Sequence, residues 1–159
     1  MHKIAIIGLD GCLGSTFLGL QDLLSLANRA IAQAQSTHET DPSNDLNNFS
    51  FLTASLTGQA FEVGANLRFD VETSLEEITI CDAVIIPSFS PMPNGKPPDM
   101  SVHAATAAWL RRHHPAAFLC ALLAEQPMGF YPPASLIRDA ERRGIAVRPV
   151  DIAASHRSE

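Results

Sequence analysis

Short apolar runs alternate along this chain with longer stretches in which apolar side chains recur every three or four residues. Residues 3–9 (KIAIIGL), 49–55 (FSFLTAS) and 82–88 (DAVIIPS) are apolar on both faces, which is typical of buried parallel strands. Residues 15–35 instead predict an amphipathic helix with Ser15 or Thr16 as its N-cap. Its stripe consists of Phe17, Leu20, Leu24, Ala27 and Ile31. Strands that alternate with helices favour a mainly parallel sheet covered by helices, so we expect an α/β fold.

The second half of the chain has a different pattern. Residues 101–112 predict a helix capped by Ser101, and residues 135–143 predict an amphipathic helix ended by Gly144. Residues 116–124 (AAFLCALLA) are apolar throughout and fit either a buried strand or a buried helix. Residues 145–150 (IAVRPV) predict a last strand. Between the two halves, we expect one or two short strands in residues 61–71 and a helix or turn at 75–80.

Composition narrows the class of protein. The 159 residues are 46% apolar and 18% charged, which indicates one folded domain, or one domain with a fragment, rather than disorder. The sequence has neither an apolar run of about 20 residues nor a signal peptide, so we expect no membrane contact. Three cysteines without a CxxC pattern argue against a disulfide framework and against a zinc site. We therefore expect a cytoplasmic protein with no metal or cofactor.

The charge changes sign along the chain. Residues 1–110 hold four basic and twelve acidic side chains, whereas residues 111–159 hold seven basic and five acidic ones. The acidic first part disfavours nucleic acid as its partner. In the second part, Arg138, Arg142 and Arg143 lie on one predicted helix. They either contact a phosphate backbone or form a solvated face paired with Asp139 and Glu141.

Ligands of parallel sheets bind where the strands end, at their carboxyl edge. This rule predicts a ligand crevice formed by six residues: Asp10, Gly11, Cys12, Ser55, Ser88 and Phe89. Asp10 either contacts a ligand or polarises a nucleophile, or it binds backbone donors of its own turn. Cys12 either has a lowered thiol pKa, because it precedes a helix, or is a small side chain without a chemical role, which is the reading that we favour. The turn carries neither a GxGxxG nor a P-loop pattern, which argues against a nucleotide.

Cys120 is the second candidate for a catalytic residue, beside Asp10. A nucleophile elbow would place Cys120 on a sharp turn between a strand and a helix, with His113 or His114 as the base. The alternative is that Cys120 is a small apolar residue within a buried helix. The absence of a flanking glycine favours the helix.

Residues 3–112 resemble the N-terminal domain of AraC-type transcription regulators, of the PfpI/ThiJ branch of the class I glutamine amidotransferase-like superfamily. The resemblance rests on KIAIIGLDGCLGSTFLGLQDLLSLANR, on FSFLTASLTGQAFEVGANLRFDVETSL and on DAVIIPS. It implies a flavodoxin-like three-layer sandwich, often dimeric, that senses a small-molecule ligand. Enzymes of the branch carry a Cys-x-Gly elbow and an acid at the position of Thr16, and this chain has neither. The helix-turn-helix half is absent as well.

Residues 113–152 (HHPAAFLCALLAEQPMGFYPPASLIRDAERRGIAVRPVDI) resemble a stretch of the error-prone bacterial DNA polymerase III alpha subunit. That stretch holds none of the polymerase's metal-binding carboxylates. The two resemblances predict a PfpI-like domain at 1–112, truncated at its last strands, and a polymerase-like, helix-rich fragment at 113–159. Our leading hypothesis is a non-catalytic, ligand-sensing domain. The alternatives are a thiol-dependent amidase- or hydratase-like enzyme that uses Cys120, and a DNA-associated polymerase remnant.

Overall fold

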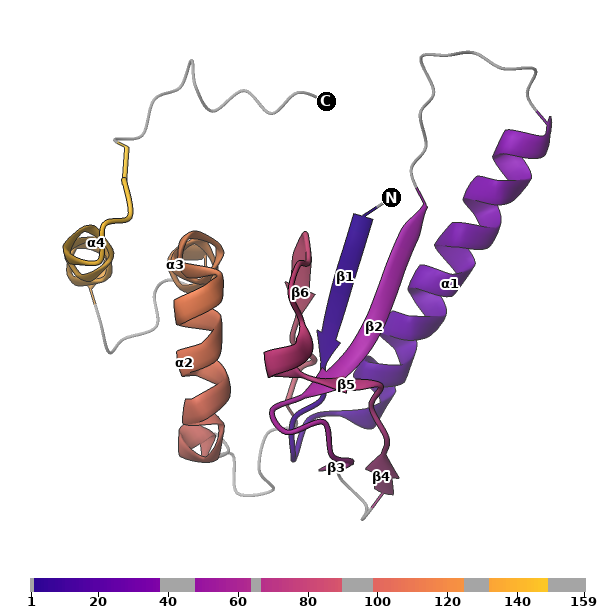
Figure 1. Ribbon diagram of the computed structural model, residues 1–159, viewed down its shortest axis with the longest axis horizontal. Coiled ribbons are helices and arrows are strands. Elements are labelled where there is room, and N and C mark those ends of the chain that lie inside the picture. The colour runs from indigo at the N-terminus through magenta and orange to yellow at the C-terminus, as the bar shows by residue number, and fades with distance from the viewer. Residues whose placement is uncertain (1, 38–47, 64–66, 90–98, 125–131, 149–159) are drawn as a thin grey trace. The chain divides into compact units, whose positions relative to one another are not determined.

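The computed structural model describes residues 2–37, 48–63, 67–89, 99–124 and 132–148, which belong to two compact units (Figure 1). Unit 1 covers Met1–His103 and contains all strands of the described residues. Unit 2 covers Ala104–Glu159, and its described part consists of helices and their connections. The protein is therefore mixed α/β with a mainly parallel sheet, as the sequence predicted.

A four-stranded parallel sheet forms the centre of unit 1, in the order β5-β2-β1-β6. Its strands are β1 (His2–Ile7), β2 (Phe49–Ser55), β5 (Thr73–Ser74) and β6 (Ala83–Ile85). The three predicted apolar runs became β1, β2 and β6, and β1 lies between the other two. Ala5, Ile6 and Ile7 of β1 are completely buried, because a central strand is covered on both faces.

Helix α1 (Gly14–Thr37) packs along the sheet beside β2 (Figure 1). Asn28 joins the two elements, since its Nδ2 donates to the Phe49 carbonyl at 2.7 Å and its Oδ1 accepts from the Phe49 N–H at 2.8 Å. The helix begins at Gly14, before the predicted caps Ser15 and Thr16. Thr16 lies in the first turn, where its hydroxyl donates to the Leu13 carbonyl at 2.7 Å.

An antiparallel hairpin of β3 (Phe61–Val63) and β4 (Leu67–Phe69) lies outside the main sheet. The sequence predicted one or two strands in this region, and both are present. The rings of Phe61 and Phe69 lie 4.8 and 5.9 Å from the ring of Phe17 on α1. This aromatic cluster of Phe17, Phe61 and Phe69 connects the hairpin to the helix.

Strand β5 leads into the short 3-10 helix η2 (Leu75–Glu77), where a helix or turn was predicted. One carboxylate oxygen of Glu77 accepts from the Ser74 N–H at 2.9 Å and from the hydroxyls of Thr73 and Ser74 at 2.7 and 2.9 Å. These donors favour the ionised carboxylate, the Ser74 N–H most strongly, and they lower the pKa of Glu77 from 4.5 to about 2.

This low pKa predicts a pH-dependent stability. A carboxyl group whose pKa is lower in the folded state stabilises the fold above its unfolded pKa, here 4.5, and loses that effect as the pH falls toward about 2. Urea unfolding of wild type and of Glu77→Gln should therefore differ in midpoint near neutral pH and converge in acid. Glu76→Gln, which removes the neighbouring exposed carboxylate, is the matched control. An equal pH dependence of the two variants would contradict the assignment.

Unit 2 contains α2 (Ala104–His113), α3 (Pro115–Ala124) and α4 (Pro133–Arg142). The ambiguous run at 116–124 is helix α3. The helix predicted from Ser101 instead starts as the 3-10 helix η3 (Met100–His103), and α2 begins at Ala104. Ser101 is not the cap, because it lies inside η3, where its own N–H donates to the Asp99 carboxylate at 2.9 Å.

Helix α4 ends as predicted at Gly144, whose φ of +82° is in the left-handed region that favours glycine. The Gly144 N–H donates to the Glu141 carbonyl at 2.9 Å, and the Ile145 N–H donates to the Ala140 carbonyl at 3.1 Å. Together these bonds form a Schellman motif, which turns Ile145 back toward the helix.

The strand predicted at 145–150 is not found in its described part, since residues 145–148 are irregular. A single strand needs a partner to satisfy its backbone groups. The described residues of unit 2 contain no other strand that could pair with it. Residues 149 and 150 lie outside the described residues.

Candidate functional site

The turn after β1 is held in place by backbone hydrogen bonds to two other segments of unit 1. The Gly11 N–H donates to the Glu62 carbonyl at 2.7 Å, and the Leu13 N–H donates to the Ser88 carbonyl at 2.8 Å. Gly11 has a φ of +79°, which glycine adopts without strain. The turn therefore has a fixed shape at the carboxyl end of the central strand, where the sequence predicted a ligand crevice.

Asp10 is part of this turn and has a structural contact. Its carboxylate accepts a hydrogen bond from the Glu62 N–H at 2.7 Å, which joins the turn to β3. Of the two roles considered for Asp10, binding a backbone donor is the one that this contact supports. The donor lies in the neighbouring hairpin rather than in the turn itself.

The environment of Cys12 is the opposite of the one predicted from its place before a helix. The side chain is only 1% exposed, and its burial raises the thiol pKa, with a further increase from the charge of Asp10. A hydrogen bond with the Leu9 backbone lowers the pKa of Cys12, but this effect is smaller than the increase caused by burial. Burial thus disfavours the thiolate of Cys12, and the prediction of a lowered pKa was wrong.

The cysteines should therefore differ in reactivity, because the thiolate is the reactive form and needs access to solvent. We expect iodoacetamide to modify the exposed Cys120 first and the buried Cys12 only when the fold opens. Mass spectrometry of quenched time points, with and without urea, measures both rates. The variant Cys120→Ser should lack the fast phase. Modification of native Cys12 at the rate of Cys120 would contradict the description of the turn.

A pocket of about 340 Å³ opens beside this turn. Its lining comes from the turn, from the start of α1 and from the β3–β4 hairpin: Gly11, Cys12, Leu13, Gly14, Ser15, Leu18, Val63, Leu67 and Phe69. Cys12 is the one titratable group in this lining. The pocket can hold an apolar group, but its lining offers no base next to a nucleophile.

Two of the six predicted crevice residues, Gly11 and Cys12, line the pocket. Ser55 is buried, with its hydroxyl donating to the Gln59 carbonyl at 2.7 Å. Ser88 is exposed and contributes its carbonyl to the turn, while the half-buried Phe89 ring lies 5.3 Å from the His103 ring.

Sequence reasoning missed the apolar side of the pocket. Val63, Leu67 and Phe69 belong to the hairpin and Leu18 belongs to α1. The signal for the hairpin was present, because Phe61 and Val63 alternate with exposed Glu62, and Leu67 and Phe69 alternate with exposed Arg68. Nothing in this alternation indicated that the hairpin folds over the turn after β1.

Cys120 lies within helix α3 and is exposed. A nucleophile elbow would place it on a sharp turn instead. The geometry required by the thiol-enzyme alternative is therefore not present at Cys120. His113 and His114, its candidate bases, lie against Trp109, with ring centroids 4.8 and 5.5 Å from that of the indole.

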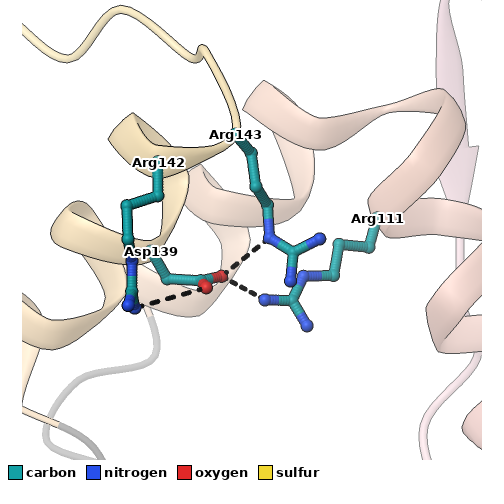
Figure 2. A network of polar contacts seen from close by, with 4 residues as sticks. All are labelled: Arg111, Asp139, Arg142 and Arg143. Atoms are coloured by element: carbon teal, nitrogen blue, oxygen red, sulfur yellow. Dashed lines mark hydrogen bonds and ion pairs between the residues drawn. The ribbon is translucent and has the colours of Figure 1, made fainter.

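In unit 2, arginines surround a single carboxylate (Figure 2). Asp139 on α4 accepts hydrogen bonds from Arg111 of α2 and, at 3.1 Å, from Arg143. Arg142 Nη2 lies 3.7 Å from the other carboxylate oxygen. The bonds from Arg143 and Arg111 hold the pKa of Asp139 below its ordinary value. Arg142 and Arg143 are thus paired within the unit, whereas the predicted nucleic-acid contact of Arg138, Arg142 and Arg143 stays a prediction.

The described residues contain neither a cluster of metal-binding side chains nor a helix that could span a membrane. No group of three His, Cys, Asp or Glu side chains there could hold a metal ion. No helix in the described part of the chain is long and apolar enough to cross a membrane.

Comparison with known proteins finds two separate similarities, and no family model matches the chain. A stretch of 52 residues, 33% of the chain, is 64% identical to an error-prone DNA polymerase of Azoarcus sp. (strain BH72). A stretch of 49 residues is 63% identical to the error-prone DNA polymerase of Methylococcus capsulatus. In both cases the chain spans about 5% of the polymerase.

Among solved structures, an AraC family transcriptional regulator from Pseudomonas putida is similar over 74% of this chain and 52% of its own, with a TM-score of 0.50 and 16% identity. A DJ-1 superfamily protein from Agrobacterium tumefaciens covers 74% of this chain and 50% of its own, with a TM-score of 0.42 and 17% identity. Both predicted resemblances are confirmed. This chain has the fold of about half of the AraC family regulator, and it shares a short sequence stretch with error-prone DNA polymerases.

Proposed function

We propose that unit 1 is a non-catalytic domain that binds a small apolar ligand, of the kind that senses ligands in AraC-type regulators. One observation carries this proposal: the pocket after β1 is apolar, and its one titratable group is a buried thiol with a raised pKa. Nucleophilic catalysis needs an activated nucleophile with a base within hydrogen-bond reach. Binding needs only the shape and the apolar lining that this pocket has.

The fold supports the same proposal. The similarity to an AraC family regulator extends over 74% of this chain. In flavodoxin-like sheets the ligand lies outside the carboxyl ends of the strands, and the pocket beside Gly11 occupies that position. The proposed partners are a small-molecule ligand and a second copy of the chain, and the proposed compartment is the cytoplasm.

Indole, a small apolar probe, tests the pocket. In a two-dimensional NMR titration it should shift the resonances of Cys12 and Phe69 in a saturable way. Leu67→Glu should abolish these shifts, because Leu67 lines the pocket and is 56% exposed, so a carboxylate there meets the probe without disturbing the core. Leu23→Glu changes a 61% exposed side chain outside the pocket lining and is the matched control.

Two results would contradict this function. Equal indole binding by Leu67→Glu and wild type would show that the pocket is not the site. Amidase or isonitrile hydratase turnover that is lost in Cys120→Ser would assign the protein to the thiol-dependent enzymes instead. Both assays use the full chain.

We also propose that the chain joins a regulator-type domain, predicted at residues 1–112, to a polymerase-type fragment, predicted at 113–159. Support comes from the two similarities, which name unrelated proteins. A 52-residue match is longer than the 47 residues of the predicted fragment, so the similarity extends beyond that fragment. The boundary between the compact units, after His103, also lies before residue 113. Long-read sequencing of the genomic DNA tests the join, and an interrupted reading frame would contradict it.

A further inference from the structure

A groove between the helices of unit 2 has a volume of about 660 Å³. Helices α2, α3 and α4 and Ile145, the last residue of the Schellman motif, all contribute to its walls. Its apolar surface includes Phe118, Leu119, Leu122, Leu136 and Ile145. Neither the mechanism considered for Cys120 nor the proposed function of unit 1 uses this groove.

The apolar surface of the groove is built by helical spacing. Phe118, Leu119 and Leu122 follow one another at one- and three-residue steps and lie on one side of α3. Leu136 faces them from α4, and the Schellman motif at Gly144 places Ile145 beside them. Phe118, Leu122, Leu136 and Ile145 remain only half-buried, so apolar area is still available to a ligand.

Positive charge lines the same groove. Arg111, Arg142 and Arg143 are all lining residues, and Asp139 is the one acidic lining residue (Figure 2). The side chains of Arg111, Arg142 and Arg143 are 42%, 71% and 51% exposed, so the N–H donors that do not bind Asp139 can reach a ligand. Three guanidinium groups around one carboxylate leave a net positive charge beside an apolar surface.

We propose that this groove binds a single-chain anionic amphiphile, a molecule with a carboxylate or phosphate head and an unbranched hydrocarbon chain. The hydrocarbon chain lies against Phe118, Leu122 and Ile145. The head group accepts hydrogen bonds from Arg111 and Arg143, whose forked donors suit carboxylates and phosphates. The volume of the groove falls within the range of roughly 300–1,000 Å³ that is typical of small-molecule sites.

Other occupants fit these observations less well. A DNA duplex would place phosphates near the arginines but would leave the apolar surface exposed to water. A second copy would have to bring its own arginines to this net positive face, where like charges repel. An uncharged apolar ligand would use the side chains of α3 and leave the arginines without a role.

Dodecanoate, added to the full chain below its micellar concentration, is the probe. Calorimetric titration should show saturable binding that weakens when the salt concentration rises from about 50 to about 500 mM, since charges at a surface are screened. The double variant Arg111→Gln, Arg143→Gln should weaken binding by about tenfold or more, because it removes both charged donors. Arg138→Gln removes an arginine of α4 that is not part of the groove lining, and it should change binding less than about twofold.

A second variant keeps the test valid if the double variant unfolds, which circular dichroism reports. Asp139→Asn removes the competing carboxylate and should strengthen dodecanoate binding. Any of the following outcomes would overturn the proposal: no saturable binding, equal affinity for dodecanol, an equal loss in Arg138→Gln, or displacement of dodecanoate by duplex DNA. A chain dimer that dodecanoate dissociates would assign the groove to a second copy and would overturn it as well.

Discussion

Replacing Phe17 with alanine is expected to lower the free energy of unfolding of unit 1 by about 4 kcal/mol, the typical cost of truncating a buried phenylalanine. Phe17 is 2% exposed and is among the largest side chains that are fully buried. Its ring meets Phe61 edge-on at 4.8 Å and lies 5.9 Å from Phe69, so the truncation removes two aromatic contacts together with the buried area. Urea unfolding followed by far-ultraviolet circular dichroism measures the change.

A control on the same helix separates packing from helix propensity. Leu23 on α1 is 61% exposed, and Leu23→Ala should cost less than about 1 kcal/mol. Phe17→Leu keeps an apolar side chain in the cluster and should fall between the two. If Phe17→Ala costs no more than Leu23→Ala, the aromatic cluster does not join the hairpin to α1 as described.

Local pattern was sufficient to predict most helices and strands. The runs at 3–9, 49–55 and 82–88 became β1, β2 and β6, because a strand that is covered on both faces must be apolar along its whole length. The stripe from Phe17 to Ile31 became α1. Strand β5 was missed, since two residues, Thr73 and Ser74, are too few to form a pattern.

The errors came from contacts that the sequence does not reveal. The run at 116–124 is equally apolar as strand or helix, and only the helix α3 of the structure resolves it. Cys12 precedes a helix, which predicts a low pKa, but its 1% exposure reverses the sign of the shift. Burial of a side chain in a turn depends on the segments that cover it, and here those segments are distant in sequence.

In both candidate sites, the residues that local spacing identifies could be predicted, whereas the residues that distant segments contribute could not. The turn at Gly11 and Cys12 could be located, because ligand pockets of parallel sheets follow the ends of strands. The hairpin residues that complete the pocket, Val63, Leu67 and Phe69, could not be assigned to it. In unit 2 the i,i+4 pairing of Asp139 with Arg143 followed from helical spacing, whereas the contact of Asp139 with Arg111, 28 residues earlier, did not.

Replacing Gly8 with alanine is expected to destabilise unit 1 by about 3 kcal/mol, since overpacking a close-packed core forces its neighbours to move. A Cβ atom on Gly8 would lie 2.2 Å from Cε1 of Phe61 and 2.4 Å from its Cδ1. The Phe61 ring cannot retreat easily, because it is 4% exposed and lies against the rings of both Phe17 and Phe69. Gly19→Ala is the matched control: Gly19 is a helical glycine with nothing within 4 Å of the added Cβ. It should stabilise the protein by about 1 kcal/mol, through the higher helix propensity of alanine.

A double-mutant cycle distinguishes this collision from a general loss of backbone freedom at Gly8. Phe61→Leu alone should destabilise the core, but in the Gly8→Ala background it also removes the ring atoms that the new methyl group meets. The cost of the double variant should therefore be smaller than the sum of the two single costs by about 1 kcal/mol or more, the coupling typical of residues in contact. Additive costs would mean that the methyl group does not meet Phe61. The description of β3 as packed over the turn after β1 would then be wrong.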